Sequence, residues 1–294
     1  MPDGVHTVRV IVTRPAREAE RWVQQFQQGG VQAEALPLIE IAPAQGAANA
    51  QALRKALQML DTYAACMFVS GNAVDHFFTQ NSASVHDENG HDAINGIADQ
   101  VAGWLPPGLR LLAPGPGTVA ALVAAGIPAG QIDAPAPDAG QFDSPALWDV
   151  IGQRDWQGRR VLVVRGENSS STGATTTSKG RNWIARQWEA AGAQVDFVSV
   201  YQRRAPRLTN AQLELACAAG SDGSVWLFSS TEAVVNLASE PVLGAMNWRG
   251  ARAVATHPRI VDAVRAAGWG VVVASRPAFE DIKDALASIE SLDP

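Results

Sequence analysis

The sequence predicts an α/β protein built of two related domains, each with a parallel β-sheet covered by helices on both faces. One observation behind this prediction is that short apolar, β-branched runs alternate with helical patterns along the 294-residue chain. A second is an internal repeat, in which three segments recur in the same order in the two halves. A third is a pair of unusually long strand patterns, one at the end of each β-α-β unit.

The first β-α-β unit is expected within residues 8–41. Residues 8–12, VRVIV, are a continuous β-branched run of the kind found in buried strands. Pro15 suits the first turn of a helix over residues 16–28, whose apolar residues recur at helical spacing. Two glycines end this helix, and residues 32–41 are expected to form the second, long strand.

The remainder of the first half alternates in the same way. We expect strands at residues 65–69 and 109–113. We expect helices at residues 48–60 and 145–151, a helix that begins at Ala73, and a separate helix that follows the turn at 114–118 and ends at Ala125. The polar segment 81–96 is expected to be a loop or a frayed helix end, and the segment 135–143, rich in Pro, Gly and Asp, a loop.

A second β-α-β unit begins with a strand at residues 161–164, continues with a helix at 181–191 and ends in a long strand at 195–204. Residues 168–179 form a low-complexity polar insertion, for which we expect a mobile surface loop, with a lid as the alternative. Beyond this unit we expect strands at residues 225–228, 251–255 and 270–274. We expect helices at residues 208–219 and 278–289, a helix that begins at the cap 229–232, and a helix that follows His257-Pro258 and ends at Ala267.

The internal repeat consists of three matched pairs of segments. GVQAEALPLIE (30–40) pairs with GAQVDFVSVYQ (192–202), FVSGNAV (68–74) with FSSTEAV (228–234), and GPGTVAALVAAGI (115–127) with HPRIVDAVRAAGW (257–269). Three matches in the same order favour duplication of one ancestral unit. In the first pair Tyr201 occupies the position of Ile39, so the two copies differ there in chemistry.

Both long strands are long enough to cross between domains, and this predicts a discontinuous domain. We expect one domain of residues 1–38 plus 204–294 and a second of residues 41–200, with crossovers near 32–43 and 194–206. Two lobes arranged in this way would face each other across a cleft.

Composition and charge narrow the class of partner. The net charge is −6, so the chain lacks the basic footprint of proteins that bind nucleic acid or anionic membranes. We find no signal peptide and no apolar window of about 20 residues, which predicts a cytoplasmic protein. Cys66 and Cys217 lack paired ligand spacing and the five histidines are scattered, so we expect reduced structural thiols and no metal.

Small polar residues gather at the turns that should follow the carboxyl ends of the strands. These turns are Thr13-Arg14, Ser70-Gly71-Asn72, Gly115-Pro116-Gly117-Thr118, Arg165-Gly166, Ser229-Ser230-Thr231 and His257-Pro258. In open α/β sheets ligands bind at this edge, where the N-terminal N–H groups and dipoles of helices attract carboxylates or phosphates. The same residue types also serve as plain helix caps. Taken together the turns favour a site for a polyanion.

Missing motifs narrow the chemistry. The sequence has no Walker loop, no GxGxxG after the first strand, no nucleophile elbow and no HExxH, so no nucleotide cofactor is expected. The candidate acids or bases at the predicted turns are Tyr201, His257, Glu167 and Glu232. Their small number suits a reaction in which the substrate supplies most of the reactivity.

Seven segments, in this order along the chain, resemble the uroporphyrinogen-III synthase family. They are VRVIVTRP (8–15), ALPLIEI (35–41), FVSGNAV (68–74), GPGTVAAL (115–122), VLVVRGE (161–167), AGAQVDFVSVYQRRAP (191–206) and FSSTEAV (228–234). The resemblance extends from about residue 8 to residue 290. It implies two α/β domains joined by a two-strand ladder.

The resemblance also implies an activity. The family closes linear hydroxymethylbilane, an octacarboxylate, into uroporphyrinogen III while inverting the last pyrrole ring, ring D. Loss of the hydroxyl gives an electrophilic azafulvene, which ring D attacks at its substituted carbon to form a spiro intermediate that rearranges. The resemblance therefore implies a cyclising lyase of tetrapyrrole biosynthesis (haem, sirohaem or cobalamin) that uses no cofactor and is expected to be a monomer. The main task of such an enzyme is to hold its small polycarboxylate substrate so that closure occurs with ring D inverted.

Matching positions carry implied roles. Tyr201 matches the tyrosine proposed to help the hydroxyl leave, by hydrogen bonding or protonation, and a phenol ordinarily stays protonated at neutral pH. The implied substrate-binding residues are Arg14, Ser70, Gly71, Asn72, Gly115, Thr118, Arg165, Gly166, Ser230 and Thr231. The last turn departs from the family pattern, because His257 and Ile260 replace the usual glycine and threonine, which argues against a substrate contact there.

Two alternatives stay open at this level. A two-lobed ligand-binding or regulatory domain of the same fold, without catalysis, would account for the departures at His257 and Ile260. Tyr201 would alternatively pack as a strand-end residue at the domain junction, and Arg203 and Arg204 would form a solvated strand end.

Overall fold

A computed structural model describes residues 8–84, 105–136, 139, 141–167 and 177–290. The chain divides into two compact units, which we call unit 1 (Met1–Glu40 and Arg204–Pro294) and unit 2 (Ile41–Arg203). Most of the insertion predicted at 168–179, and residues 85–96 of the predicted polar segment, lie outside the described residues.

Unit 1 is built on a five-stranded sheet in the order β11-β10-β9-β1-β2, and all its pairings are parallel. Its strands are β1 (Val10–Val12), β2 (Ala33–Ala35), β9 (Val225–Phe228), β10 (Arg252–Ala255) and β11 (Val271–Ala274). Its helices are α1 (Ala16–Gln28), α8 (Asn210–Ala219), α9 (Thr231–Ser239), α10 (Pro241–Gly244), α11 (Pro258–Ala266) and α12 (Phe279–Glu290). The short α10 was not expected.

Unit 2 is built on a six-stranded sheet in the order β3-β8-β7-β4-β5-β6. Its strands are β3 (Glu40–Pro43), β4 (Ala65–Phe68), β5 (Arg110–Leu112), β6 (Ile132–Asp133), β7 (Arg160–Gly166) and β8 (Gln194–Arg204). Its helices are α2 (Ala47–Gln58), α3 (Gly71–Ser84), α5 (Pro116–Ala124), α6 (Ser144–Ile151) and α7 (Thr177–Ala190), with 3-10 turns at Leu60–Thr62 and Ala129–Gln131. The loop predicted through residue 179 is therefore wrong for residues 177–179, which begin α7, and β6 was not foreseen.

The two sheets share one topology, which confirms the internal repeat. Replacing β1, β2, β9, β10 and β11 by their repeat partners β7, β8, β4, β5 and β6 turns the order of the unit 1 sheet into that of unit 2, apart from the added β3. Each unit therefore takes its β-α-β segment from one copy of the repeat and its other three strands from the other copy. Each compact unit thus combines part of one copy with part of the other, because the strands of both parts pair in one sheet.

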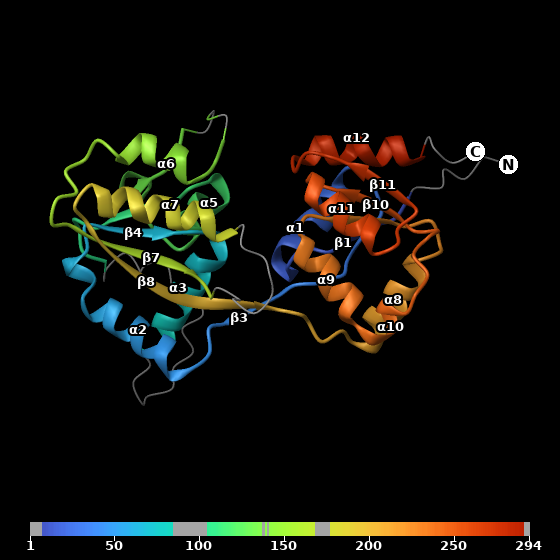
Figure 1. Ribbon diagram of the computed structural model, residues 1–294, viewed down its shortest axis with the longest axis horizontal. Helices are drawn as coiled ribbons and strands as arrows, with labels where there is room; N and C mark the ends of the chain where they lie inside the picture. Colours follow the sequence, from blue (N-terminus) through green and yellow to red (C-terminus); the bar gives the residue numbers. More distant parts are fainter. Residues whose placement is uncertain (1–7, 85–104, 137–138, 140, 168–176, 291–294) are drawn as a thin grey trace. The chain divides into compact units, whose positions relative to one another are not determined.

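Both faces of the unit 2 sheet are covered, as the sequence predicts. Because alternate side chains of a strand face opposite sides, Cys66 and Phe68 of β4 pack in a cluster with α2, α3 and α5, whereas Ala65 and Met67 pack with α6 and α7. Figure 1 shows α6 and α7 on one side of this sheet and α2 and α3 on the other. Each fully buried Phe or Leu contributes about 1.5–3 kcal/mol, so these two cores position the helices.

Unit 1 follows the same rule. Val12 of β1 and Leu227 of β9 pack with α1 and α12. On the opposite face Trp226 lies edge-on to Trp248 and Trp269, and those two rings stack at 4.3 Å. The indole N–H of Trp226 donates to the carbonyl of Ala219 in α8 at 3.0 Å, which satisfies a buried polar group.

The crossing segments differ from the expectation. The single strand predicted at residues 32–41 is wrong, because the chain forms β2 in one sheet, breaks, and then forms β3 in the other. Pro37 lies in the break, where it has no N–H to donate to a ladder. By contrast β8 runs unbroken for 11 residues. β3 is the neighbour of β8, and the Ala44 N–H donates to the Val200 carbonyl at 3.1 Å, so a two-strand ladder joins the units.

Candidate functional site

The carboxyl ends of β8 and β4 bring Tyr201 and Ser70 together in unit 2. Tyr201 lies in β8 and is buried, with 5% of its surface exposed. Its hydroxyl is 3.3 Å from Ser70 Oγ, and either group can donate. Ser70 stands between β4 and α3, and its Oγ also accepts the N–H of Ala73 at 3.3 Å. Ser70 is therefore both a helix cap and the hydrogen-bond partner of the phenol.

Gly166 lies directly beside the Tyr201 ring. β7 and β8 pair in parallel, and a register shift between Arg165 and Gly166 places Gly166 opposite Tyr201. A Cβ on Gly166 would lie 2.6 Å from both Cε2 and Cζ of the phenol, far inside van der Waals contact. The N–H of Glu167 donates to the Tyr201 carbonyl at 2.7 Å. The end of β7 thus holds both the ring and the backbone of Tyr201.

His76 of α3 is a neighbour that the sequence reasoning missed. Its ring stacks on Tyr201 with centroids 5.9 Å apart and planes inclined by 28°. The site residues expected from the sequence lie mostly at turns after strands, whereas His76 lies inside α3. An available signal was its spacing from Asn72, since residues four apart lie on the same face of a helix.

The other predicted residues of unit 2 lie at neighbouring strand ends. Asn72 is half-buried in the first turn of α3, and a Cβ on Gly71 would make ordinary contact, 3.5 Å, with Ala121 of α5. Gly115 is the N-cap of α5 and supplies no side-chain cap, whereas Thr118 in the first turn is buried. Because β4 and β5 are adjacent, these two helix starts lie at one edge of the sheet.

Arg165 and Glu167 flank Gly166 at the end of β7. The Arg165 guanidinium lies 4.4 Å from the ring centroid of the half-exposed Phe197. The Glu167 carboxylate accepts a hydrogen bond from the side-chain amide of Asn49 in α2. These contacts fix the turn after β7, so the strand end that carries Gly166 is held on both sides.

Arg14 is the strongest candidate for anion binding in unit 1. Its guanidinium packs 4.4 Å over the ring of Trp22 and pairs with Glu18 at 3.4 Å. Burial lowers the pKa of Arg14, an effect that Glu18 partly opposes, but an arginine remains charged at neutral pH. Its buried Nε has no hydrogen-bond acceptor among the described residues. A buried, unsatisfied donor of this kind is costly, and an anionic ligand would satisfy it.

The remaining turns of unit 1 are helix caps. Ser230 Oγ accepts the N–H of Glu232 at 3.2 Å and caps α9, and Thr231 is exposed beside it. His257 caps α11, because its Nδ1 accepts the N–H of Arg259 at 3.2 Å. Ile260 is buried, as is Thr118 at the matching position in unit 2. The two departures from the family pattern thus have local structural roles, one as a cap and one in the core.

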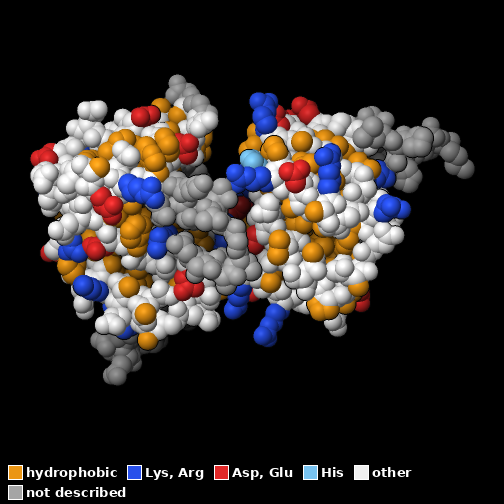
Figure 2. All heavy atoms as spheres, viewed as in Figure 1, with side chains coloured by type: hydrophobic (Ala, Val, Ile, Leu, Met, Phe, Trp, Pro, Cys, Tyr) orange, Lys and Arg blue, Asp and Glu red, His pale blue; other side chains and the backbone are white. Residues whose placement is uncertain are grey.

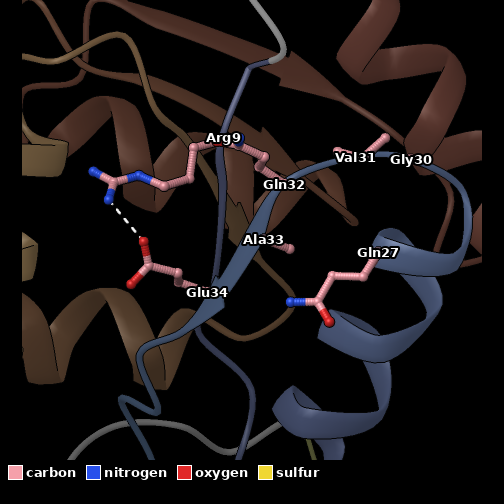
Figure 3. Close-up of a pocket in the computed structure, with 7 residues that line it drawn as sticks. All are labelled: Arg9, Gln27, Gly30, Val31, Gln32, Ala33 and Glu34. Carbon is pink, nitrogen blue, oxygen red and sulfur yellow. Dashed lines mark hydrogen bonds and ion pairs between the residues drawn. The ribbon is translucent and has the colours of Figure 1, made fainter.

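Two concave regions lie at the opposite, amino ends of the strands. One, of about 370 Å³, is formed by the start of β1 and β2, where the Arg9 guanidinium pairs with Glu34 at 2.7 Å (Figure 3). Arg9 also bonds Asp222 and Ser224. The other, of about 540 Å³, lies before β4, β5 and β7, and there Arg110 is paired with Asp133. Arg9 and Arg110 each make two hydrogen bonds to carboxylate oxygens, so these two guanidinium groups have less donor capacity left for an anion than Arg14 has.

Acidic and basic side chains are intermixed on the surface that Figure 2 shows. On the face seen in Figure 2, the basic side chains of each unit are scattered among acidic and apolar ones. Among the described residues on that face, the basic side chains therefore form no continuous patch. In the part of the chain that the structure describes, no helix combines the length and the apolarity that crossing a membrane requires.

Comparison with known proteins gives one family and a set of related folds. Residues 20–283 match the family described as uroporphyrinogen-III synthase HemD. Uroporphyrinogen-III synthetase from Helicobacter pylori 26695 is similar in structure, with 11% identity, coverage of 96% of this chain and 99% of that chain, and a TM-score of 0.51. A mutant uroporphyrinogen III synthase from the extremely thermophilic bacterium Thermus thermophilus matches with 17% identity, coverage of 96% and 99%, and a TM-score of 0.49. At these identities the Helicobacter match establishes a shared fold.

Proposed function

Because this chain belongs to the uroporphyrinogen-III synthase family, we propose that it cyclises hydroxymethylbilane to uroporphyrinogen III, with inversion of ring D and loss of water. This places it among the hydro-lyases of tetrapyrrole biosynthesis, upstream of haem, sirohaem or cobalamin. The proposal includes a cytoplasmic monomer that uses neither a metal nor an organic cofactor.

The observation that carries the proposal is the hydrogen bond between Tyr201 and Ser70 at 3.3 Å. A buried phenol needs a polar partner in any setting. Here that partner is a hydroxyl at a helix N-terminus, on the edge of a parallel sheet where α/β proteins bind their ligands. This position supports a phenol used in chemistry over one that only fills a core.

The proposed first step is the departure of the substrate hydroxyl. Tyr201 donates its proton as the C–O bond breaks, so water leaves and a phenolate remains. Ser70 Oγ accepts the N–H of Ala73, which leaves its own O–H available to stabilise that phenolate. The pyrrole N–H proton released as the azafulvene forms restores the phenol, so the enzyme is unchanged at the end of the step.

We propose that the substrate carboxylates are bound by Arg14, by Arg165 and by the N-terminal turns after the strands. Those turns include Ser70, Gly71, Asn72, Gly115, Thr118, Gly166, Ser230 and Thr231. The start of α5 supports this role, because its N-cap glycine leaves the helix dipole without a side-chain cap. The unsatisfied Nε of Arg14 supports it in unit 1.

The test is the identity of the product isomer. Hydroxymethylbilane is made enzymatically, added fresh to the purified protein, and the products are oxidised and separated as porphyrin isomers. Isomer III in excess of a protein-free control would support the proposal. Isomer I alone, as simple cyclisation gives, would reject it and favour a non-catalytic ligand-binding domain of the same fold.

A further inference from the structure

Three elements surround the Tyr201 side chain in unit 2. The end of β7 contributes Gly166, whose absent Cβ leaves the space that the ring occupies. The interior of α3 contributes His76, whose ring stacks on the phenol. The N-cap of the same helix contributes Ser70, which bonds the phenol oxygen. One helix therefore supplies both the ring contact and the hydroxyl contact.

The space beside Gly166 admits no side chain. Ordinary contacts of a Cβ lie at about 3.4–4 Å, whereas the Cε2 and Cζ atoms of Tyr201 would be 2.6 Å from a Cβ at residue 166. The ring cannot retreat easily, because Tyr201 belongs to the packed cluster that includes Phe68 and Val200. A substitution here must therefore displace the phenol or the turn after β7.

The stacking of His76 on Tyr201 limits the side-chain rotation that would move the Tyr201 hydroxyl. Rotation about χ2 leaves the phenol oxygen on the ring axis, but a change of χ1 moves the oxygen by several ångströms. An aromatic ring beside the phenol blocks such a change, and offset pairs of this kind add about 0.5–1.5 kcal/mol to simple burial.

We propose that His76 and Gly166 are positioning residues, which hold the Tyr201 ring so that its hydroxyl meets Ser70 and the departing hydroxyl of the substrate. This inference rests on the proposed function and assigns Gly166 a role beside the phenol, in addition to its place in a proposed carboxylate-binding turn. A misplacement of about 1 Å can reduce catalysis about 100-fold, so these contacts are large enough to control the rate.

The kinetic test compares matched variants by the isomer assay. We expect His76→Ala to lower kcat about tenfold with KM nearly unchanged, and to raise the share of isomer I. His76→Phe, which keeps an aromatic face, should retain at least about a third of the wild-type kcat. Gly166→Ala should lower kcat about 100-fold, whereas Gly130→Ala, at a position in the same unit with open space around it, should not.

A second measurement reports the ring itself, without any substrate. The protein has two tyrosines, so ring-labelled tyrosine gives two sets of NMR signals, and Tyr63→Phe assigns them. Gly166→Ala and His76→Ala should shift the Tyr201 signals and leave those of Tyr63 in place, while Gly130→Ala should move neither.

The outcomes separate the two hypotheses. If wild-type protein forms only isomer I, the proposed function fails, whereas the NMR arm still reports whether the ring is held. Wild-type kcat in His76→Ala, or equal losses in His76→Phe and His76→Ala, would overturn positioning by stacking. Unmoved Tyr201 signals in Gly166→Ala would overturn the role of Gly166.

Discussion

Tyr201 and Tyr63 are the two tyrosines of the protein, and they lie at opposite ends of the unit 2 sheet. Tyr63 precedes β4, and its hydroxyl donates to the Asp196 carboxylate at 2.9 Å. Burial, together with this hydrogen bond, raises the pKa of Tyr63, so its proton is tightly held. Tyr201 instead shares a hydrogen bond with another hydroxyl, which can give as well as accept a proton. Of the two tyrosines, Tyr201 is therefore the one that we propose for proton transfer.

This contrast gives a matched pair of variants. We expect Tyr201→Phe to lower kcat for hydroxymethylbilane about 100-fold or more, because the general-acid contribution is lost while the ring still packs. Tyr63→Phe should keep the wild-type rate and lose about 1 kcal/mol of unfolding free energy with its hydrogen bond. Isomer-resolved kinetics and urea unfolding check both variants. Equal rates for Tyr201→Phe and wild type would remove the catalytic role.

Two of the polar turns in unit 1 act as helix caps. Ser230 and His257 are helix caps by direct hydrogen bonds to N–H groups, as their residue types allowed. His257 stands where the family usually has a glycine, which argues against a substrate contact at this turn. The structure adds that the imidazole supplies a cap that glycine cannot.

Cys66 is buried in the unit 2 core, where desolvation raises the pKa of its thiol and keeps it unreactive.

At the scale of elements, the crossing segments are the main departure from sequence expectation. An apolar pattern predicts extended chain over residues 32–41, but it does not report which sheet each part joins. β2 pairs with β1, whereas β3 is a neighbour of β8, and the chain must break to change partners. Pro37 suits that break and Ile39 is buried within it. Its repeat partner Tyr201 stays in an unbroken strand.

The edge strand β6 is anchored by a buried carboxylate. Asp133 accepts hydrogen bonds from Arg110 at 2.7 and 2.9 Å and from Arg154, which follows α6, at 2.7 Å. Burial alone would raise the pKa of Asp133, but the two guanidinium groups outweigh it and lower the pKa to about 2. The interaction joins β5, β6 and the end of α6.

We expect Asp133→Asn to lower the unfolding free energy at neutral pH by about 1–2 kcal/mol, a value reduced for screening because both arginines are about one-third exposed. The folded-state pKa lies below the unfolded value of about 3.9, so the contribution is present above pH of about 4 and is lost toward pH of about 2. Urea unfolding of wild type and variant should therefore converge on acidification. Exposed Asp149→Asn is the control, and a gap between wild type and Asp133→Asn that stays constant with pH would contradict the assignment.

At the scale of the whole molecule, the large apolar side chains that are exposed among the described residues do not share one helix or strand. They are Val123, Phe142, Val150, Phe197, Val235 and Val242, and they come from different elements. Scattered exposed residues of this kind are normal on monomers, whereas stable interfaces need a contiguous patch. We expect sedimentation equilibrium at micromolar concentration to give a mass near 31.0 kDa. A mass near twice that value would reject the monomer.

The sequence alone determined the alternation of strands and helices, the repeat, the polar turns and the asymmetry between Ile39 and Tyr201. These features depend on neighbours along the chain, so local patterns carry them. Only the tertiary structure decided that Tyr201 meets Ser70, which lies 131 positions away, and that His76 and Gly166 border its ring. The reason is that contacts across a sheet depend on strand order and register. Here a single shift at Arg165 and Gly166 places a glycine, and no bulkier residue, beside the phenol.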